Sequence, residues 1–216
     1  MIGASQKLAC YIDVVGESYG DQLTALRTSS YNRHYGEDVD ISALRWNPWD
    51  LRFFSLGVFE NHQLVSTLRL AHIKTERDYQ QMMLSKFNSD AVSLPVVILS
   101  RAATHENYES RGLHTLLRYH AFGLALASGA NWVAGTFKMD AKRARQLESM
   151  GYTLEVNPVP WDDFLKSHEP TYTATINLSV HFDNARSRML NTIAPLLETY
   201  PVLYSQDVLV KRMLKS

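Results

Sequence analysis

The hydrophobic pattern is most regular between residues 95 and 152. An apolar run over 96–99 leads into a polar loop that ends at Gly112. From there, apolar residues recur at helical spacing: Leu113, Leu116, Leu117, Ala121 and Leu124. A second short apolar run covers 132–137. The pattern predicts strand, loop, helix and strand, because buried strands are short apolar runs and an amphipathic helix repeats every three to four residues.

The segment before this unit predicts a helix and a hairpin. Leu23 and Leu26 lie at helical spacing, so we expect a helix over 20–35 that Gly36 ends. β-rich runs over 53–59 and 64–73 flank a short polar stretch and predict two paired strands. Residues 37–50 have no clear period and predict a loop, and residues 75–87 predict another helix.

The segment after the unit mixes short strands with helices. We expect a helix over 140–150, strands over 152–156 and 171–182, and helices over 183–200 and 206–214. Pro195 should kink or restart the longer of these two last helices. This organisation predicts one domain over 1–182, with 183–216 as a C-terminal helical extension of it or as an oligomerisation surface.

Composition narrows the class of protein. The 216 residues include 45% hydrophobic and 20% charged residues, which is an ordinary globular balance. Lys and Arg number 22 and so do Asp and Glu, which argues against a broad nucleic-acid surface. No apolar stretch approaches the length of a membrane span, and the single cysteine, Cys10, cannot form an intrachain disulfide. We therefore expect a cytoplasmic protein without integral membrane contact.

The loop before Leu113 has the features of an anion-binding turn. It reads Glu109, Ser110, Arg111, Gly112, Leu113 and His114. Backbone N–H groups at the start of a helix hold phosphates and developing oxyanions. Arg111 and Gly112 fit the phosphate-binding signature of the GNAT acyltransferase superfamily, whose core this order of elements resembles. An ordinary strand-to-helix turn built on Gly112 is the alternative interpretation.

A second resemblance lies in the strand before this loop. Its Ser100-Arg101 pair resembles a strand of the acyl-homoserine-lactone synthases and N-acyl amino acid synthases, which are GNAT-like families. Arg27 in the first helix, Asp50 before the hairpin and the sequence VSTLRL over 65–70 match further motifs of these families in the same order. The resemblance covers roughly residues 20–155.

This resemblance implies a fold and an activity. The implied fold is α/β (α+β), with a mixed, mostly antiparallel twisted sheet flanked by helices and a C-terminal helical extension. The implied activity is transfer of an acyl group, expected to be fatty, to the amine of a small acceptor such as an amino acid. Acyl carrier protein or acyl-coenzyme A would present the donor thioester on phosphopantetheine, and no metal is expected.

The resemblance also assigns roles to residues. Ser100 and Asp50 are candidate catalytic residues, and Arg69, Arg101 and Arg27 are candidate substrate-binding residues. The phosphopantetheine would be held by Ala102, Ala103, Ser110, Arg111, Gly112, Leu113 and His114. The alternative for Asp50 is a loop carboxylate that caps a turn. The alternative for Arg69 and Arg101 is a salt bridge to Asp50 or Asp38.

Three positions depart from the pattern of these families. Ile98 stands where they carry Glu, Leu147 where many acetyltransferases carry a general-acid Tyr, and His114 where a small residue lets a pyrophosphate approach. A short-chain GNAT N-acetyltransferase and a non-catalytic acyl-thioester-binding protein are therefore alternatives. The phosphopantetheine of acyl carrier protein brings a single phosphate, which needs less space at the turn than a pyrophosphate. We therefore expect acyl carrier protein as donor and partner. Its acidic surface would meet Arg111, Arg118, Lys138, Lys142, Arg143 and Arg145.

Overall fold

The computed structural model describes residues 9–36, 40–83, 87–138, 141–157 and 171–215. Its centre is one seven-stranded sheet in the order β1-β2-β3-β4-β5-β7-β6. All neighbours are antiparallel except β4 and β5. The strands are β1 (Cys10–Val14), β2 (Phe54–Glu60), β3 (Gln63–Ile73), β4 (Val96–Thr104), β5 (Trp132–Lys138), β6 (Thr153–Asn157) and β7 (Thr171–Asn177). The mixed, mostly antiparallel sheet is the one that the sequence predicted.

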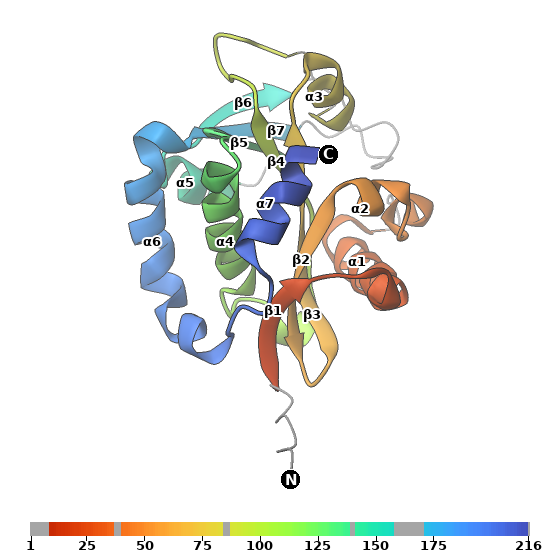
Figure 1. Ribbon diagram of the computed structural model, residues 1–216. Coiled ribbons are helices and arrows are strands. Elements are labelled where there is room, and N and C mark those ends of the chain that lie inside the picture. Colours follow the sequence, from red (N-terminus) through yellow and green to blue (C-terminus); the bar gives the residue numbers. More distant parts are fainter. Residues whose placement is uncertain (1–8, 37–39, 84–86, 139–140, 158–170, 216) are drawn as a thin grey trace.

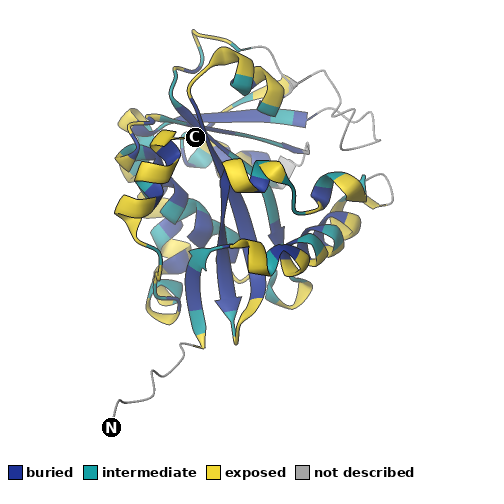
Figure 2. Cartoon of the chain, turned by 45° about the vertical axis from the view of Figure 1, so that its right-hand side comes forward, coloured by how far each residue is buried: buried dark blue, intermediate teal, exposed yellow. Residues whose placement is uncertain are grey.

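Helices cover both faces of this sheet. Figure 1 places α4 and α6 on one side of it and α1 and α2 on the other. The α-helices are α1 (Gly20–Tyr35), α2 (Pro48–Arg52), α3 (Glu76–Met83), α4 (Leu113–Ala127), α5 (Ala141–Ser149), α6 (Leu178–Thr199) and α7 (Gln206–Lys215). Short 3-10 helices are η1 (Glu17–Tyr19), η3 (Ile41–Leu44) and η4 (Glu106–Tyr108). Strands β2 and β3 are almost wholly buried between these layers (Figure 2).

The buried side chains form three clusters around the sheet. The largest joins α4, α6 and α7 to the sheet, and Leu116, Phe122 and Met189 lie inside it. A second cluster packs α1 on the opposite face through Leu23 and Leu26, and a third lies under α3. The residues after 183 therefore contribute to the same core as the strands.

The C-terminal segment also touches the outer strand of the sheet. Ile12 of β1 donates its N–H to the carbonyl of Pro201 over 2.9 Å and accepts from the N–H of Leu203 over 2.9 Å. This pairing covers an edge that would otherwise expose backbone hydrogen-bonding groups. None of the helices in the described ranges is long and apolar enough to cross a membrane.

Two segments and one strand differ from the sequence predictions. The strand expected over 171–182 ends at Asn177, because the Asn177 side chain accepts the Ser179 N–H over 3.0 Å and begins α6. The expected loop over 37–50 contains η3 and the start of α2, although residues 37–39 lie outside the described residues. Strand β1 was not predicted, since its five residues include the polar Asp13. Pro195 lies inside α6, which continues through it.

Candidate active site

The site begins where β4 and β5 part. These parallel strands pair at three positions, the last being Ile98 with Ala134. No further ladder pair joins them in the part of the chain that the structure describes, although β4 continues to Thr104. Gly135 lies at the parting, where an added Cβ would come within 2.9 Å of the Leu99 carbonyl oxygen. The backbone of β4 beyond this point is open to a ligand on the β5 side. The sequence predicted this divergence near Ala102, and it begins slightly earlier.

The other edge of β4 is irregular at the same level. The pairing of β3 with β4 shifts register between Thr67 and Arg69. Opposite the shift, Arg101 adopts a left-handed φ of 52°, which is uncommon for a residue with a side chain. A bulge of this kind bends a strand and changes the direction in which its side chains point. It coincides here with the place where β4 lines a cavity.

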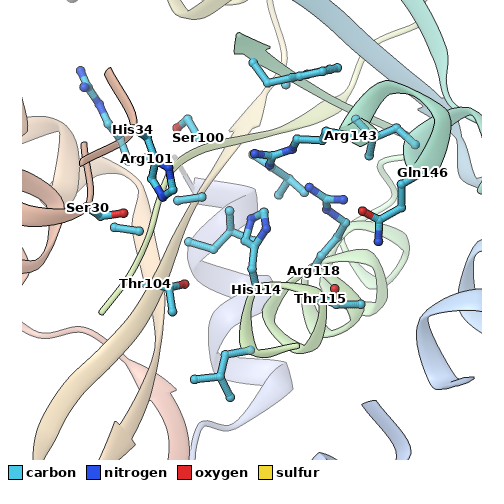
Figure 3. A pocket seen from close by; sticks show the side chains of 18 of the residues that line it. Ser30, His34, Ser100, Arg101, Thr104, His114, Thr115, Arg118, Arg143 and Gln146 are labelled. Carbon is cyan, nitrogen blue, oxygen red and sulfur yellow. The ribbon is translucent and has the colours of Figure 1, made fainter. Parts of the chain in front are cut away.

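A cavity of about 840 Å³ fills the space between the parted strands. Most of its lining residues come from α1, β4, the turn before α4, α4 itself, β5 and α5. Because α1 and α4 pack on opposite faces of the sheet, the cavity passes through the gap between β4 and β5. Figure 3 shows Arg101 and Ser100 on one side of this space and His114, Arg118 and Arg143 on the other.

The turn before α4 is shaped to leave its amides available. Gly112 has a left-handed φ of 84° and Ser110 has one of 62°. Gly112 is the N-cap of α4, and no side chain caps the helix there. The first N–H groups of a helix have no partner within the helix, so an uncapped start can hold an anion. The strand, loop, helix and strand over 95–137 and the position of Gly112 are therefore confirmed.

Most of the predicted donor-binding residues lie on the cavity wall. Ala102, Ala103, Ser110, Gly112, Leu113 and His114 all line it. Arg111 does not, since it is exposed and its guanidinium lies 4.7 Å from the centre of the Tyr108 ring. Glu109 lines the cavity and accepts from Arg33 over 2.8 Å, with His34 at 3.2 Å. The hydrogen bond from Arg33 lowers the pKa of Glu109, and Arg33 carries the charge opposite to this carboxylate at the cavity wall.

Arg69, Ser100 and Arg101 are close together, but they differ in their access to the cavity. Ser100 and Arg101 line it, and Arg69 lies behind Ser100, to whose Oγ its Nε donates over 3.1 Å. Burial, with Arg101 and Arg27 nearby, lowers the pKa of Arg69 to about 9. Burial also lowers the pKa of Arg101. Of these two candidate substrate-binding arginines, Arg101 therefore lies on the cavity wall and Arg69 does not.

Asp50 and Arg27 form a buried ion pair away from the cavity wall. Arg27 donates to both carboxylate oxygens, over 3.1 and 2.8 Å, and to the Oγ of Ser55 over 3.2 Å. Asp50 also accepts the N–H of Asn47 over 3.2 Å, which completes the capping box of α2. Neither residue lines the cavity. This placement corresponds to the capping alternative for Asp50, and the salt-bridge partner is Arg27 instead of Arg69 or Arg101.

Several cavity residues were not predicted to bind substrate. Tyr31 and Tyr35 of α1 stack with ring centres 5.4 Å apart, and burial raises the pKa of Tyr35 to about 12. Arg118 and Arg143 also line the cavity, although the sequence placed them on a surface for a carrier protein. The sequence did contain a signal for part of this group, because His114 and Arg118 are four residues apart on α4 and so lie on the same face of the helix. The side chains of Lys138 and Lys142 lie outside the described residues.

Comparison with known proteins identifies the fold. No protein-family model matches the chain, and no curated protein matches it either. An N-acyl amino acid synthase, FeeM, from uncultured soil microbes has a solved structure with a TM-score of 0.61 and 10% identity, covering 81% of this chain and 94% of that one. This chain has the GNAT fold. The parted β4 and β5 and the uncapped turn before α4 lie within this GNAT-fold sheet and its flanking helix.

Two further structures share the GNAT fold with this chain. BjaI, a CoA-dependent acyl-homoserine lactone synthase, has a TM-score of 0.62 and 14% identity, covering 96% of this chain and 100% of BjaI. An N-acetyltransferase described from Lactobacillus plantarum has a TM-score of 0.54 and 18% identity, covering 79% of this chain and 99% of that one. These identities are low, so the likeness extends to the fold and leaves the substrates open.

Proposed function

We propose that the protein is an N-acyltransferase that moves an acyl group from a phosphopantetheine thioester to the amine of a small acceptor such as an amino acid. The observation that carries this proposal is the gap between β4 and β5 beside the uncapped turn at Gly112. A turn that can hold a phosphate and a gap that can admit the pantetheine arm suit such a donor. The fold shared with an N-acyl amino acid synthase and an acyl-homoserine lactone synthase supports the same reaction class.

The chemistry follows from the groups along β4. The amine nitrogen forms a bond to the thioester carbonyl carbon, the carbon–sulfur bond breaks, and the amine loses a proton while the thiolate leaves. Open backbone N–H groups near Ala102 would stabilise the oxyanion that develops on the carbonyl. Ser100 Oγ accepts from Arg69, which leaves its own hydrogen available for donation to the oxyanion or the thiolate. Arg101, on the cavity wall, would bind the carboxylate of the acceptor.

The acyl group is proposed to be fatty, and its place is the apolar part of the gap. Leu68, Leu99, Ala134, Phe137 and Ala174 line this part of the cavity. A chain of several methylene groups would gain about 0.8 kcal/mol for each one buried there. The cytoplasmic location and an oligomer formed through α6 and α7 remain predictions from the sequence.

We propose acyl carrier protein as the preferred donor, with acyl-coenzyme A as the alternative. The phosphopantetheine of a carrier protein brings one phosphate to the turn at Gly112, and the exposed Arg111 and Arg145 are available to its acidic surface. The preference should shrink with added salt, because exposed charges are screened over about 8–10 Å at physiological ionic strength. Measuring kcat/KM for one acyl group on both carriers at low and high salt tests this. Equal values, or a preference for acyl-coenzyme A that ignores salt, would reject the carrier protein.

A non-catalytic acyl-thioester-binding protein is the second candidate. Ile98 and Leu147 are buried apolar residues at positions where related families place an acid or a tyrosine, so neither can transfer a proton. Incubating the protein with acyl donors of several chain lengths and a mixture of amino acids, followed by mass spectrometry, separates the candidates. We expect an N-acylated amino acid and one free thiol per product. Binding of the donor without product would favour the second candidate, and product from acetyl donors alone would favour an acetyltransferase.

A further inference from the structure

A cluster of basic side chains, two arginines and a histidine, lies inside the cavity beyond the turn at Gly112. His114 and Arg118 project from α4 and Arg143 from α5, and all three line the cavity. Figure 3 shows their ends turned toward one space. Arg118 comes more than one helical turn after Leu113. Its guanidinium group therefore provides donors that are distinct from the backbone amides at the start of the helix.

Aromatic rings hold the two guanidinium groups in place. Arg118 lies over the ring of Tyr152, 5.9 Å from its centre, and Arg143 lies over Phe137 at 5.6 Å. An aromatic face contacts the plane of a guanidinium group and does not occupy the N–H groups at its edge. This arrangement positions donors for a ligand without itself supplying negative charge.

Arg118 and Arg143 bring guanidinium groups to a cavity whose wall holds few acids. Among the described residues that line the cavity, Glu109 is the only acid, and it is engaged by Arg33 and His34. Two atoms of the cluster, Arg118 Nε and His114 Nε2, are buried and have no hydrogen-bond partner among the described residues. Buried polar atoms without partners are unfavourable, so an anion in the cavity would stabilise Arg118 Nε, and His114 Nε2 in the tautomer that carries the hydrogen there.

Two of the three groups are in surroundings that disfavour their charged forms. Burial, followed by Arg118 and Arg143, lowers the pKa of His114 well below its ordinary value. Burial, followed by Arg118, lowers the pKa of Arg143. A bound anion would reverse this repulsion, because an opposite charge within a few ångströms favours the charged form of each group.

We propose that His114, Arg118 and Arg143 form a binding site for a substrate oxyanion, separate from the amides of the turn at Gly112. Two sources of an oxyanion are compatible with the cavity. One is the phosphate of the donor, reached from the turn by the long side chain of Arg118. The other is a carboxylate of the acceptor or of the acyl chain. The site is a binding site, so it does not depend on acyl transfer taking place.

Calorimetry with two matched pairs of probes tests the site and assigns its source. Phosphopantetheine and pantetheine differ by the phosphate, and hexanoate and hexanamide differ by the carboxylate charge. In each of the variants Arg118→Gln and Arg143→Gln, the affinity for a charged probe should fall about tenfold or more, since hydrogen bonds to charged groups are the stronger ones. The affinity for its neutral partner should stay within about twofold.

Two further variants and a stability measurement serve as controls. Arg188→Gln removes an exposed charge from α6, away from the cavity wall, and should leave all four affinities unchanged. Arg118→Lys keeps the charge and should retain part of the affinity that Arg118→Gln loses. Thermal unfolding of each variant shows that it is folded.

Each result of the calorimetry either supports the proposed site or overturns it. A selective loss for phosphopantetheine supports the site and assigns it to the donor, and a selective loss for hexanoate supports it and assigns it to a carboxylate. The proposal is overturned if neither charged probe binds more tightly than its neutral partner, or if both members of a pair weaken equally. Anion binding without acyl transfer would leave this site standing and reject the proposed function.

Discussion

Replacing Asp50 with asparagine should destabilise the protein. Asp50 should have no direct part in the chemical step. Asp50 and Arg27 are each only 1% exposed, and their two hydrogen bonds of 2.8 and 3.1 Å are buried. The substitution keeps the shape of the side chain and removes its charge, which leaves the Arg27 guanidinium buried without a counter-ion. Breaking a buried pair in this way costs about 3–5 kcal/mol. For a chain of this size that corresponds to a fall in Tm of about 6–20 °C.

Thermal unfolding followed by circular dichroism measures this effect. Asp78→Asn is the matched control, because Asp78 pairs with Arg52 at 3.5 Å on the surface, where ion pairs contribute about 0–1 kcal/mol. The double replacement Arg27→Met with Asp50→Leu should recover much of the lost stability, since apolar residues of similar volume can replace a buried pair. If Asp50→Asn unfolds at the wild-type temperature and yet abolishes acyl transfer, the structural role is wrong and Asp50 acts on the substrate.

Two further substitutions test particular positions. Burial lowers the pKa of His120 to about 4 from its ordinary 6.5, so the unfolded chain takes up a proton that the folded chain refuses; the free energy of unfolding should fall by up to about 3 kcal/mol as pH drops from 6.5 to 4. His120→Gln should flatten this dependence in urea titrations, and an unchanged slope would contradict the assignment. Gly112→Ala places a Cβ at a left-handed φ of 84°, so it should cost about 1–2 kcal/mol and raise the KM of the donor. Gly123→Ala, inside α4 with open space around its Cβ, should preserve or raise stability, and equal behaviour of the two variants would refute the role of the turn.

The central unit of the fold could be predicted because its information is local. The apolar run of β4, the glycine at 112 and the periodicity of α4 each lie within a few residues, and together they give strand, turn and helix. Strand β1 and the boundary between β7 and α6 could not be predicted in this way. Strand β1 is short and is stabilised by pairing with β2 and with residues 201–203. At the boundary, a run that alternates like a strand begins a helix because Asn177 caps it.

The candidate site was predictable only as far as its backbone. Ser100, Arg101, Ala102 and most of the turn residues were named from the resemblance to GNAT-like families, and they line the cavity because they lie on the backbone beside the gap. The partners of the charged side chains were not predicted. Asp50, for example, pairs with Arg27 because of the packing of α1 against α2. Arg118 and Arg143 converge because of how α4 and α5 lie relative to the cavity. The spacing of residues within either helix does not predict the relative position of the two helices.

The most direct test of the account is amine-dependent release of thiol from an acyl-phosphopantetheine thioester, compared between the wild type and Ala102→Phe. Ala102 lines the cavity where β4 has left β5, so a phenyl ring there would fill the path of the donor. We predict that the wild type releases one thiol for each N-acyl product, and that Ala102→Phe, with a Tm close to that of the wild type, releases almost none. No thiol release from the wild type with any amine, or equal rates for the two proteins, would contradict the assignment of this gap as the site of acyl transfer.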